Sequence, residues 1–190
     1  NPYCCKEQFS NRGVEHILFL NRINLLLYVS TEENKEIFHN LSIDSLLGCG
    51  GFSDVYTGVY NNKTIAIKIV SIDEKKRNKS YLNMKMEHEA ILKISDHKQV
   101  YNESKLFTTF YFNVMTASSL TIGMEKCVCD LFHLLESVVQ LNLYEIGFYG
   151  LELALALHHI HSLNIIHRDV KLENIFIGTD GHLRLGDFGS

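Results

Sequence analysis

Residues 167–174 read His167-Arg168-Asp169-Val170-Lys171-Leu172-Glu173-Asn174, and the triplet Asp187-Phe188-Gly189 follows further along the chain. Apolar residues precede the first segment and polar residues fill it, a pattern typical of a functional loop held on a packed base. Taken singly, Asp169, Asn174 and Asp187 would be turn or capping residues, which is the usual role of Asp and Asn. Their joint spacing indicates a charged site instead.

A glycine-rich turn lies well upstream of this loop. Residues 41–47 and 55–60 read as two strands, and the segment between them begins with Gly48-Cys49-Gly50-Gly51. Glycine has no Cβ and tolerates positive φ, so the backbone N–H groups of such a turn can approach a triphosphate. Standing alone, the same turn would indicate a plain hairpin.

A lysine in an apolar strand is the third feature. Residues 64–70 are rich in β-branched side chains and predict a strand, within which Lys68 needs a partner because an unpaired buried ammonium is costly. Residues 80–94 have the spacing of a helix. We predict Glu87 as the partner, because the residues three, four and seven positions on are apolar, whereas Glu89 has charged neighbours and reads as a solvated surface residue.

The remaining pattern is β-rich first and helical afterwards. Segments around 105–112 and 120–126 read as two more strands, and residues 143–162 as a long helix. The inward candidates of that helix include Leu151, Leu155 and His158. With 190 residues, 46% of them hydrophobic, the chain can bury the core of one compact domain.

Composition excludes several classes of partner. A formal net charge of −4 provides no broad basic field, so we expect no nucleic acid. The apolar stretch 17–29 is too short to span a bilayer and is interrupted by polar residues, so we expect no membrane segment. Five unevenly spaced cysteines argue against a disulfide framework and favour an intracellular location, cytoplasmic or nuclear.

The glycine turn, the Ile65-Ala66-Ile67-Lys68 strand and the loop with its Asp187-Phe188-Gly189 triplet occur in a fixed order. In that order the chain resembles the eukaryotic-type serine/threonine protein kinase family. The resemblance covers roughly residues 41–190 and implies an α+β, two-lobed fold. Residues 41–126 would form the β-rich N-lobe with its helix, and residues 127–190 the hinge and the first part of a helical C-lobe. Residues 1–40 match nothing in that pattern and would be an N-terminal extension of unknown role.

The resemblance implies a role for each charged residue. Lys68 would pair the α- and β-phosphates of ATP and the Glu87 carboxylate. Asp169 would accept or orient the proton of the attacking hydroxyl, while Asn174 and Asp187 would hold Mg²⁺. Lys171 would offset charge on the transferred group, and its presence favours serine and threonine over tyrosine as substrates.

The resemblance also implies a nucleotide pocket. Met124 would be the gatekeeper, the main chain after it would hold adenine, and Asp130 would be available to a ribose hydroxyl. Val55, Ala66 and Phe176 would sandwich the base. The implied nucleotide contacts are Gly48, Gly50, Gly51, Ser53, Val55, Ala66, Lys68, Met124, Glu125, Cys127, Asp130 and Phe176.

Two functions are compatible with these residues. The first is transfer of the γ-phosphoryl group of ATP to a protein hydroxyl. The stretch from Gly147-Phe148-Tyr149 to Leu163 and the Gly181-His182-Leu183-Arg184-Leu185 lead into Asp187 resemble most the group containing the cyclic-nucleotide-dependent kinases. That narrower resemblance implies basic substrates, with Glu173 and Asp130 as acidic contacts. The second is a truncated, inactive module that acts as a decoy or regulator of another kinase. Retention of Asp169 and Lys171 together with both magnesium candidates favours the enzyme.

Overall fold

The computed structural model describes residues 32–49, 53–72, 77–100, 106–116, 118–137 and 140–189. The chain divides into two compact units, Asn1–Ser42 and Ile43–Ser190. The helix α2 (Glu32–His39) belongs to the first unit, and no element was predicted there from the sequence. It ends at His39, and the backbone N–H and side-chain amide of the next residue, Asn40, both donate to the Glu36 carbonyl, at 3.3 and 3.2 Å.

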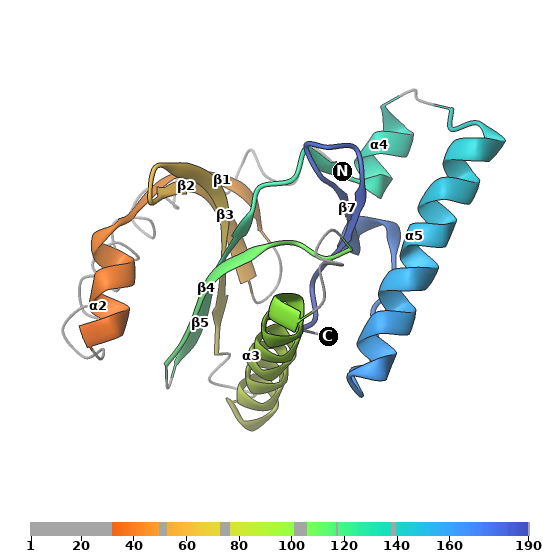
Figure 1. Cartoon of the computed structure of the whole chain (residues 1–190). Coiled ribbons are helices and arrows are strands. Elements are labelled where there is room, and N and C mark those ends of the chain that lie inside the picture. Colours follow the sequence, from red (N-terminus) through yellow and green to blue (C-terminus); the bar gives the residue numbers. More distant parts are fainter. Residues whose placement is uncertain are drawn as a thin grey trace. The chain divides into compact units, whose positions relative to one another are not determined.

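The second unit contains a five-stranded sheet with the order β1-β2-β3-β5-β4 (Figure 1). Its strands are β1 (Leu41–Cys49), β2 (Ser53–Tyr60), β3 (Lys63–Ser71), β4 (Phe110–Met115) and β5 (Ser119–Glu125). Asn61 and Asn62 connect β2 to β3 with φ values of 49° and 62°, the left-handed backbone that a two-residue hairpin turn requires. The strand predicted around 105–112 begins later, because Phe107 instead forms an isolated bridge with Leu185.

The register of the sheet gathers predicted site residues on one face. Val55 of β2 lies opposite Lys68 of β3, and Ala66 lies opposite Met124 of β5. Directly paired residues of antiparallel strands share a face, and so do residues two apart in one strand. Val55, Ala66, Lys68 and Met124 therefore all project from the same side of the sheet.

The helix α3 (Arg77–Val100) packs on that side. It is longer at both ends than the predicted span of 80–94. Met84 and Ile91 of α3 form a buried cluster with Leu120 and Ile122 of β5. The sequence periodicity that predicted an inward face for this helix is therefore matched by packing, and the packing fixes where Glu87 lies.

A smaller sheet and two helices follow. The sheet has the order β6-β7-β8 and consists of β6 (Cys129–Asp130), β7 (Ile175–Ile177) and β8 (Leu183–Leu185). The helices are α4 (Leu131–Glu136), which was not predicted, and α5 (Leu143–Ser162). Asn142 caps α5 by accepting N–H donors from the first turn, and Glu145 closes a capping box.

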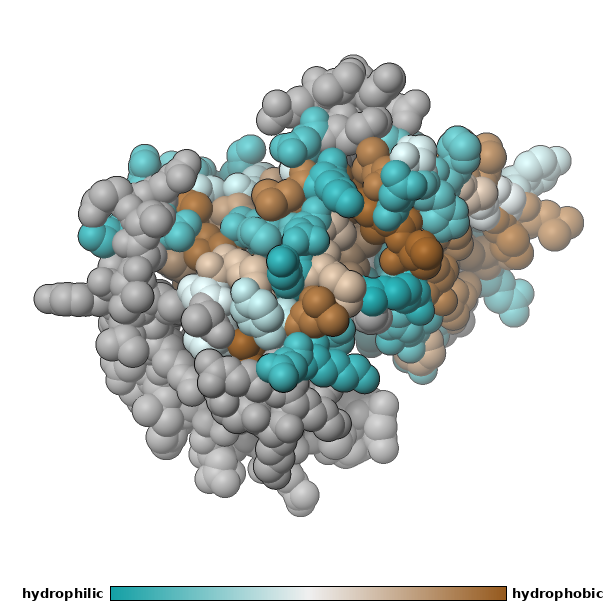
Figure 2. Space-filling view, turned by 90° about the horizontal axis from the view of Figure 1, so that it is seen from below, coloured by the Kyte–Doolittle hydropathy of each residue, from teal (hydrophilic) through white to brown (hydrophobic). Residues whose placement is uncertain are grey.

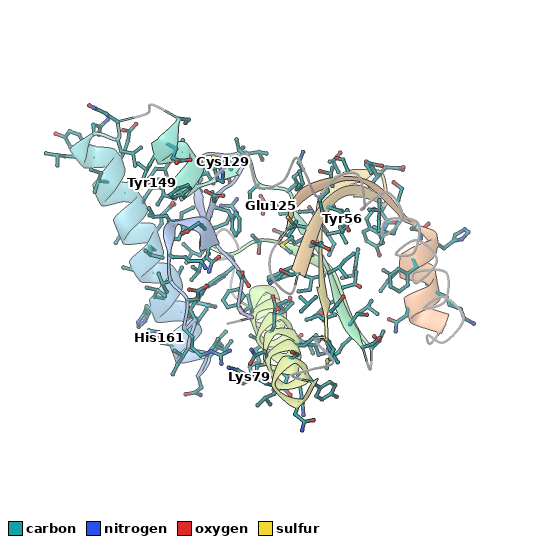
Figure 3. All side chains as sticks on the ribbon, turned by 180° about the vertical axis from the view of Figure 1, so that it is seen from behind. Tyr56, Lys79, Glu125, Cys129, Tyr149 and His161 are labelled. Atoms are coloured by element: carbon teal, nitrogen blue, oxygen red, sulfur yellow. The ribbon has the colours of Figure 1, made fainter. Side chains whose placement is uncertain are left out.

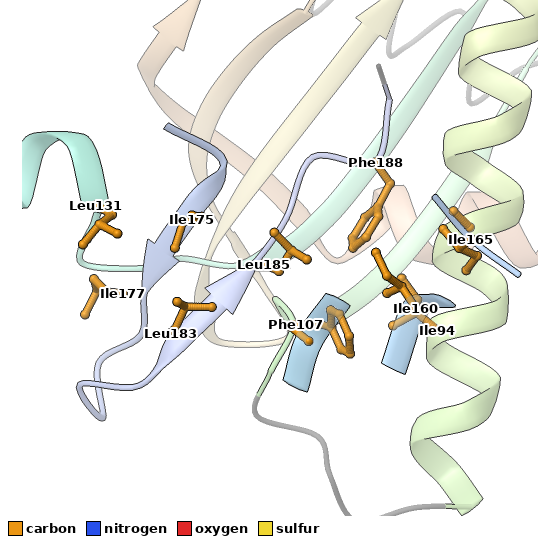
Figure 4. Close-up of a cluster of buried hydrophobic side chains, with 12 residues drawn as sticks. Ile94, Phe107, Leu131, Ile160, Ile165, Ile175, Ile177, Leu183, Leu185 and Phe188 are labelled. Atoms are coloured by element: carbon orange, nitrogen blue, oxygen red, sulfur yellow. The ribbon is translucent and has the colours of Figure 1, made fainter. Parts of the chain in front are cut away.

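A second buried cluster joins this part to the first. The cluster contains Ile94 of α3, Ile160 of α5 and Leu185 of β8. Phe107, which precedes β4, and Phe188 pack with them. Figure 4 shows these side chains converging from the two helices and from the strands of the small sheet. Because the last strand leads directly to residues 186–189, the core determines where the Asp187-Phe188-Gly189 triplet lies.

The predicted inward face of α5 is wrong. Leu151 and Leu155 are 60% and 47% exposed, and His158 is exposed; the buried residues of this helix are Ala156 and Ile160. The helix is apolar around most of its circumference, so its periodicity does not single out one face. Figure 2 shows hydrophobic side chains gathered toward the side where α5 lies. The exposed apolar residues of α5 are Leu143, Tyr144, Ile146, Phe148, Leu151 and Leu155.

Within the described residues, no helix has both the length and the apolar composition needed to cross a membrane.

Candidate active site

Lys68 lies at the centre of the site. Its Nζ donates to Glu87 Oε1 at 2.7 Å, and both side chains are buried, with 10% and 4% of their surfaces exposed. Glu87 comes from the sheet-facing side of α3, whereas Glu89 is exposed and lies 3.8 Å from Lys85. Glu87, and not Glu89, therefore contacts Lys68.

Asp187 is the second partner of Lys68. The same Nζ donates to Asp187 Oδ1 at 2.7 Å. Burial would lower the pKa of Lys68, but the charges of Glu87 and Asp187 outweigh it and the pKa is raised. Burial would raise the pKa of Asp187, but Lys68 and the Gly189 N–H lower it overall. The ammonium and the Asp187 carboxylate are thus both charged at neutral pH.

The backbone at Asp187 and Gly189 is shaped for this contact. Asp187 has a φ of 61°, in the left-handed region that a non-glycine residue rarely adopts. The N–H of Gly189 donates to Asp187 Oδ1 at 3.4 Å. A Cβ at Gly189 would overlap the carboxylate of Glu87, so a side chain there would displace Glu87 or the backbone. Glycine permits the close approach.

The loop at 167–174 holds Asp169 between two donors. Lys171 Nζ lies 2.8 Å from Asp169 Oδ2, and Asn174 Nδ2 donates to the same oxygen at 3.0 Å and to the Asp169 carbonyl at 2.8 Å. Asn174 is buried, whereas the side chains of Asp169 and Lys171 are 32% and 47% exposed. Asp169 raises the pKa of Lys171 through this hydrogen bond. The carboxylate is therefore oriented at the surface by groups fixed below and beside it.

His167 supports both segments, although the sequence reasoning did not assign it a role. Its Nε2 lies 2.8 Å from the Gly186 carbonyl, and since a carbonyl only accepts, this nitrogen carries the proton. The imidazole is buried, and its ring centroid lies 5.2 Å from that of Phe188. The Gly186 N–H also donates to the Asn174 carbonyl at 3.1 Å. The sequence signal for His167 was its place next to Arg168 at the start of the loop.

Five of the twelve predicted nucleotide contacts, Lys68 among them, lie on the face that carries Lys68. Ser53 and Val55 are half-buried in β2, Ala66 is buried in β3, and Met124 is half-buried in β5. Gly48 is exposed at the end of β1, while Gly50 and Gly51 lie outside the described residues. The ring of Phe176 packs against Gly186, and a Cβ added at Gly186 would lie 2.9 Å from Cε2 of that ring.

The residues after β5 are engaged in structure. Cys127 is half-buried, and burial together with the Glu125 charge raises the pKa of its thiol to about 12. Asp130 caps α4: its Oδ1 accepts the His133 N–H at 2.8 Å, and His133 Nδ1 lies 2.7 Å from Oδ2. A ribose contact by Asp130, which the resemblance implied, would compete with these bonds and stays a prediction.

The donor set suits a hard cation. Asp187 supplies a carboxylate, and Asn174 directs its amide nitrogen to Asp169, which leaves its amide oxygen as an acceptor. Oxygen ligands of these two kinds are those that Mg²⁺ prefers. The residues therefore fit the magnesium role. In the part of the chain that the structure describes, no group of three or more His, Cys, Asp or Glu side chains could hold a metal.

Comparison with known sequences identifies similar proteins. A sequence model of the family described as "Protein kinase domain" matches residues 41–190. A probable serine/threonine-protein kinase of Dictyostelium discoideum is 34% identical over 79% of this chain and 32% of its own length. The 3-phosphoinositide-dependent protein kinase 1 of Arabidopsis thaliana is 29% identical over 80% of this chain and 30% of its own. A putative ribosomal protein S6 kinase alpha-1 of Caenorhabditis elegans is 32% identical over 76% of this chain and 18% of its own length. The chain thus spans about a third or less of these relatives.

Proposed function

Because the chain belongs to the eukaryotic-type serine/threonine protein kinase family, we propose that the protein containing it transfers the γ-phosphoryl group of ATP to a serine or threonine hydroxyl of a protein. One observation carries the proposal: Lys68 lies 2.7 Å from both Glu87 and Asp187. A charged ammonium held between two carboxylates is placed where phosphate oxygens could replace one of its two contacts while the other holds it.

The nucleotide would lie against the face that carries Val55, Ala66 and Met124. Mg²⁺, when bound, supplies charge neutralisation to the phosphates, and Asp187 and Asn174 would hold it. Lys68 would then exchange its bond to Asp187 for phosphate oxygens while keeping Glu87. The lowered pKa of Asp187 supports this step, because the carboxylate stays ionised and able to take a cation.

Asp169 would act on the substrate hydroxyl. The bonds from Lys171 and Asn174 favour its charged form and turn one carboxylate oxygen into the loop. Its partly exposed edge can then accept a proton from an incoming hydroxyl. Lys171, which already lies beside Asp169, would offset negative charge on the group being transferred and supports a preference for serine and threonine.

The preferred substrates would carry basic residues near the hydroxyl. Glu173 is exposed one residue before Asn174, where an acidic side chain can meet an arginine. Asp130 supports this preference less, because it caps α4. The narrower resemblance to the cyclic-nucleotide-dependent kinases remains a prediction, as does an intracellular location, cytoplasmic or nuclear.

An inactive decoy that binds another kinase gains nothing from the geometry. A module that only binds needs no more than a surface for the nucleotide. It does not need the Asp169 carboxylate to be held by both Lys171 and Asn174. The enzyme accounts for both sets of contacts, so we retain it as the proposed function.

A phosphotransfer assay on the full-length protein tests the proposal. We expect Asp169→Asn to lower kcat on the order of 100-fold or more, because it removes the general base, while nucleotide affinity is kept. Asp96→Asn, which changes an exposed aspartate of α3, is the matched control and should leave the rate unchanged. Near-equal rates for the wild type and Asp169→Asn would contradict the role of Asp169.

A further inference from the structure

A buried cation connects the two sheets at a distance from Lys68. Arg184 of β8 is 5% exposed, and its Nε lies 3.3 Å from Glu125 Oε2. One terminal nitrogen of its guanidinium donates to both carboxylate oxygens of Asp180 at 3.0 Å, and the other donates to the Leu183 carbonyl at 3.3 Å. Figure 3 shows Glu125 where the chain leaves the five-stranded sheet toward Cys129.

The surrounding backbone is fitted to this cation. A Cβ at Gly178 would lie 3.0 Å from the guanidinium carbon and 2.8 Å from Asp180 Oδ1, so a side chain there would displace the end of Arg184 or of Asp180. Glu125 is likewise fixed, because Oε2 also accepts the Thr109 N–H at 3.3 Å. An arginine buried with two carboxylates is strongly held, and its guanidinium geometry suits several bonds at once.

The position of the cluster in the fold gives it a consequence for the site. Glu125 ends β5 and pairs with Ile65 of β3, the strand that carries Lys68. Arg184 lies in β8, whose end leads directly to Asp187. The Glu125–Arg184 pair therefore connects β5 of the larger sheet to β8 of the smaller one, and the Lys68–Asp187 pair connects β3 of the larger sheet to the residues that follow β8.

We propose that Arg184 is a positioning residue that fixes the angle between the five-stranded and the three-stranded sheets, and so holds Asp187 opposite Lys68 before the nucleotide binds. This inference rests on the proposed function. Without the cation, Glu125 and Asp180 become two partly buried like charges, and the two sheets lose a connection. The fraction of molecules with Lys68 and Asp187 aligned then falls, and the apparent nucleotide affinity falls by the same factor.

This mechanism predicts a division between two kinetic constants. In Arg184→Met of the full-length protein, we expect the KM for ATP to rise about tenfold or more, the scale of a lost charged hydrogen bond. The kcat should stay within about twofold, because saturating nucleotide restores the alignment. Loss of folded protein would instead lower kcat at unchanged KM. Arg184→Lys keeps the charge and should recover part of the affinity, and Glu125→Gln should resemble Arg184→Met more weakly.

Lys93→Ala is the matched control, because it removes an exposed cation of α3 that belongs to neither sheet and should leave the KM unchanged. Hydrogen exchange of the unliganded protein tests the inference separately from the proposed function. Amides in 123–130 and 183–189 should exchange faster in Arg184→Met and not in Lys93→Ala. If the wild type transfers no phosphoryl group, the proposed function is wrong. The exchange result then still tests whether Arg184 holds the two sheets together. Unchanged exchange, exchange accelerated throughout the chain, or a kcat loss at constant KM would overturn the inference.

Discussion

The two halves of the site are built differently. Lys68 and Glu87 come from a central strand and a packed helix, and their side chains are almost fully buried. Asp169 and Asp187 come from loops, are about one-third exposed, and depend on hydrogen bonds from neighbouring residues for their positions. Arg168 and Asp187 of these loops both have positive φ, at 68° and 61°. Regular structure thus positions Lys68 and Glu87, the cationic half, whereas local hydrogen bonds and positive-φ backbone position Asp169 and Asp187, the loop half, which under the proposed function would exchange ligands.

This difference shows where rigidity would be needed. Under the proposed function, a lysine that meets phosphates can be held in place by a buried partner such as Glu87. The loop carboxylates would take a cation or a proton and so need exposed edges, and the lowered pKa of Asp187 keeps that carboxylate ionised for a cation. Lys68 joins the two halves through its 2.7 Å contacts on either side.

The largest effect should follow from removing that junction. Lys68→Met leaves Glu87 and Asp187 without their shared cation and removes the phosphate contact, so we expect kcat/KM to fall about 100-fold to 1,000-fold. Lys63→Met, at the exposed start of the same strand, is the control and should change the rate little. Steady-state phosphotransfer with full-length protein measures both variants. If kcat/KM falls less than about tenfold in Lys68→Met, then Asp169 and Asp187 support the reaction without Lys68.

A smaller effect should follow from changing only the helix partner. Glu87→Gln keeps the size of the side chain but removes a charged hydrogen bond to Lys68, which corresponds to about 10-fold to 100-fold in kcat/KM. Asp187 still holds Lys68 in this variant, so the loss should stay below that of Lys68→Met.

Glu89→Gln is the internal control for that experiment. It lies two residues away on the same helix, is exposed and pairs weakly with Lys85 at 3.8 Å, so its rate should match the wild type. Equal losses in the two variants would contradict the assignment of Glu87 as the inward residue.

The cationic half was the part that local sequence patterns could predict. The β-branched run around Lys68 predicted a strand, and the apolar neighbours of Glu87 predicted its direction, because both signals lie within one element. The loop half could not be found this way. Asp169, Asn174 and Asp187 were selected only because their spacing resembles a known family, since a loop has no periodicity to read.

Other features depended on long-range packing and were missed. Arg184 and Glu125 lie far apart in the sequence, and nothing near either residue indicates that they meet. The same reason explains the wrong inward face of α5, where apolar residues occur around the helix and only the tertiary contacts select Ala156 and Ile160. The short helix α4 was missed because its capping residue, Asp130, was read as a ligand contact.

The contact between the two halves gives a third prediction. Gly189→Ala places a methyl group where the Glu87 carboxylate lies, so Glu87 or the triplet must shift and kcat/KM should fall about tenfold. The loss should be smaller in a Glu87→Ala background, where the methyl group has room, because coupled sites are not additive. A double-mutant cycle on kcat/KM measures this. Strict additivity would show that the glycine acts through its own backbone instead.

The smallest expected effect concerns the segment that follows β5 and tests whether the Glu125 charge reaches beyond Arg184. Burial and Glu125 raise the pKa of Cys127 from 9.0 to about 12, which suppresses its thiolate at neutral pH. Glu125→Gln removes a negative charge, so the pKa should fall and alkylation of Cys127 should become a few-fold faster between about pH 8 and pH 10. Mass spectrometry of iodoacetamide-labelled peptides gives the rate at each pH.

Cys129 is the control in the same molecule, because burial and Asp130 raise its pKa and Glu125 does not contribute. Greater access to the segment after β5 would speed the alkylation of both cysteines at every pH, whereas a change in charge would speed that of Cys127 alone. In the wild type the rate at Cys127 should keep rising with pH up to about 10, because the thiol is still far from its pKa of about 12. A plateau at Cys127 below that pH would contradict the raised pKa that burial and the Glu125 charge give this thiol.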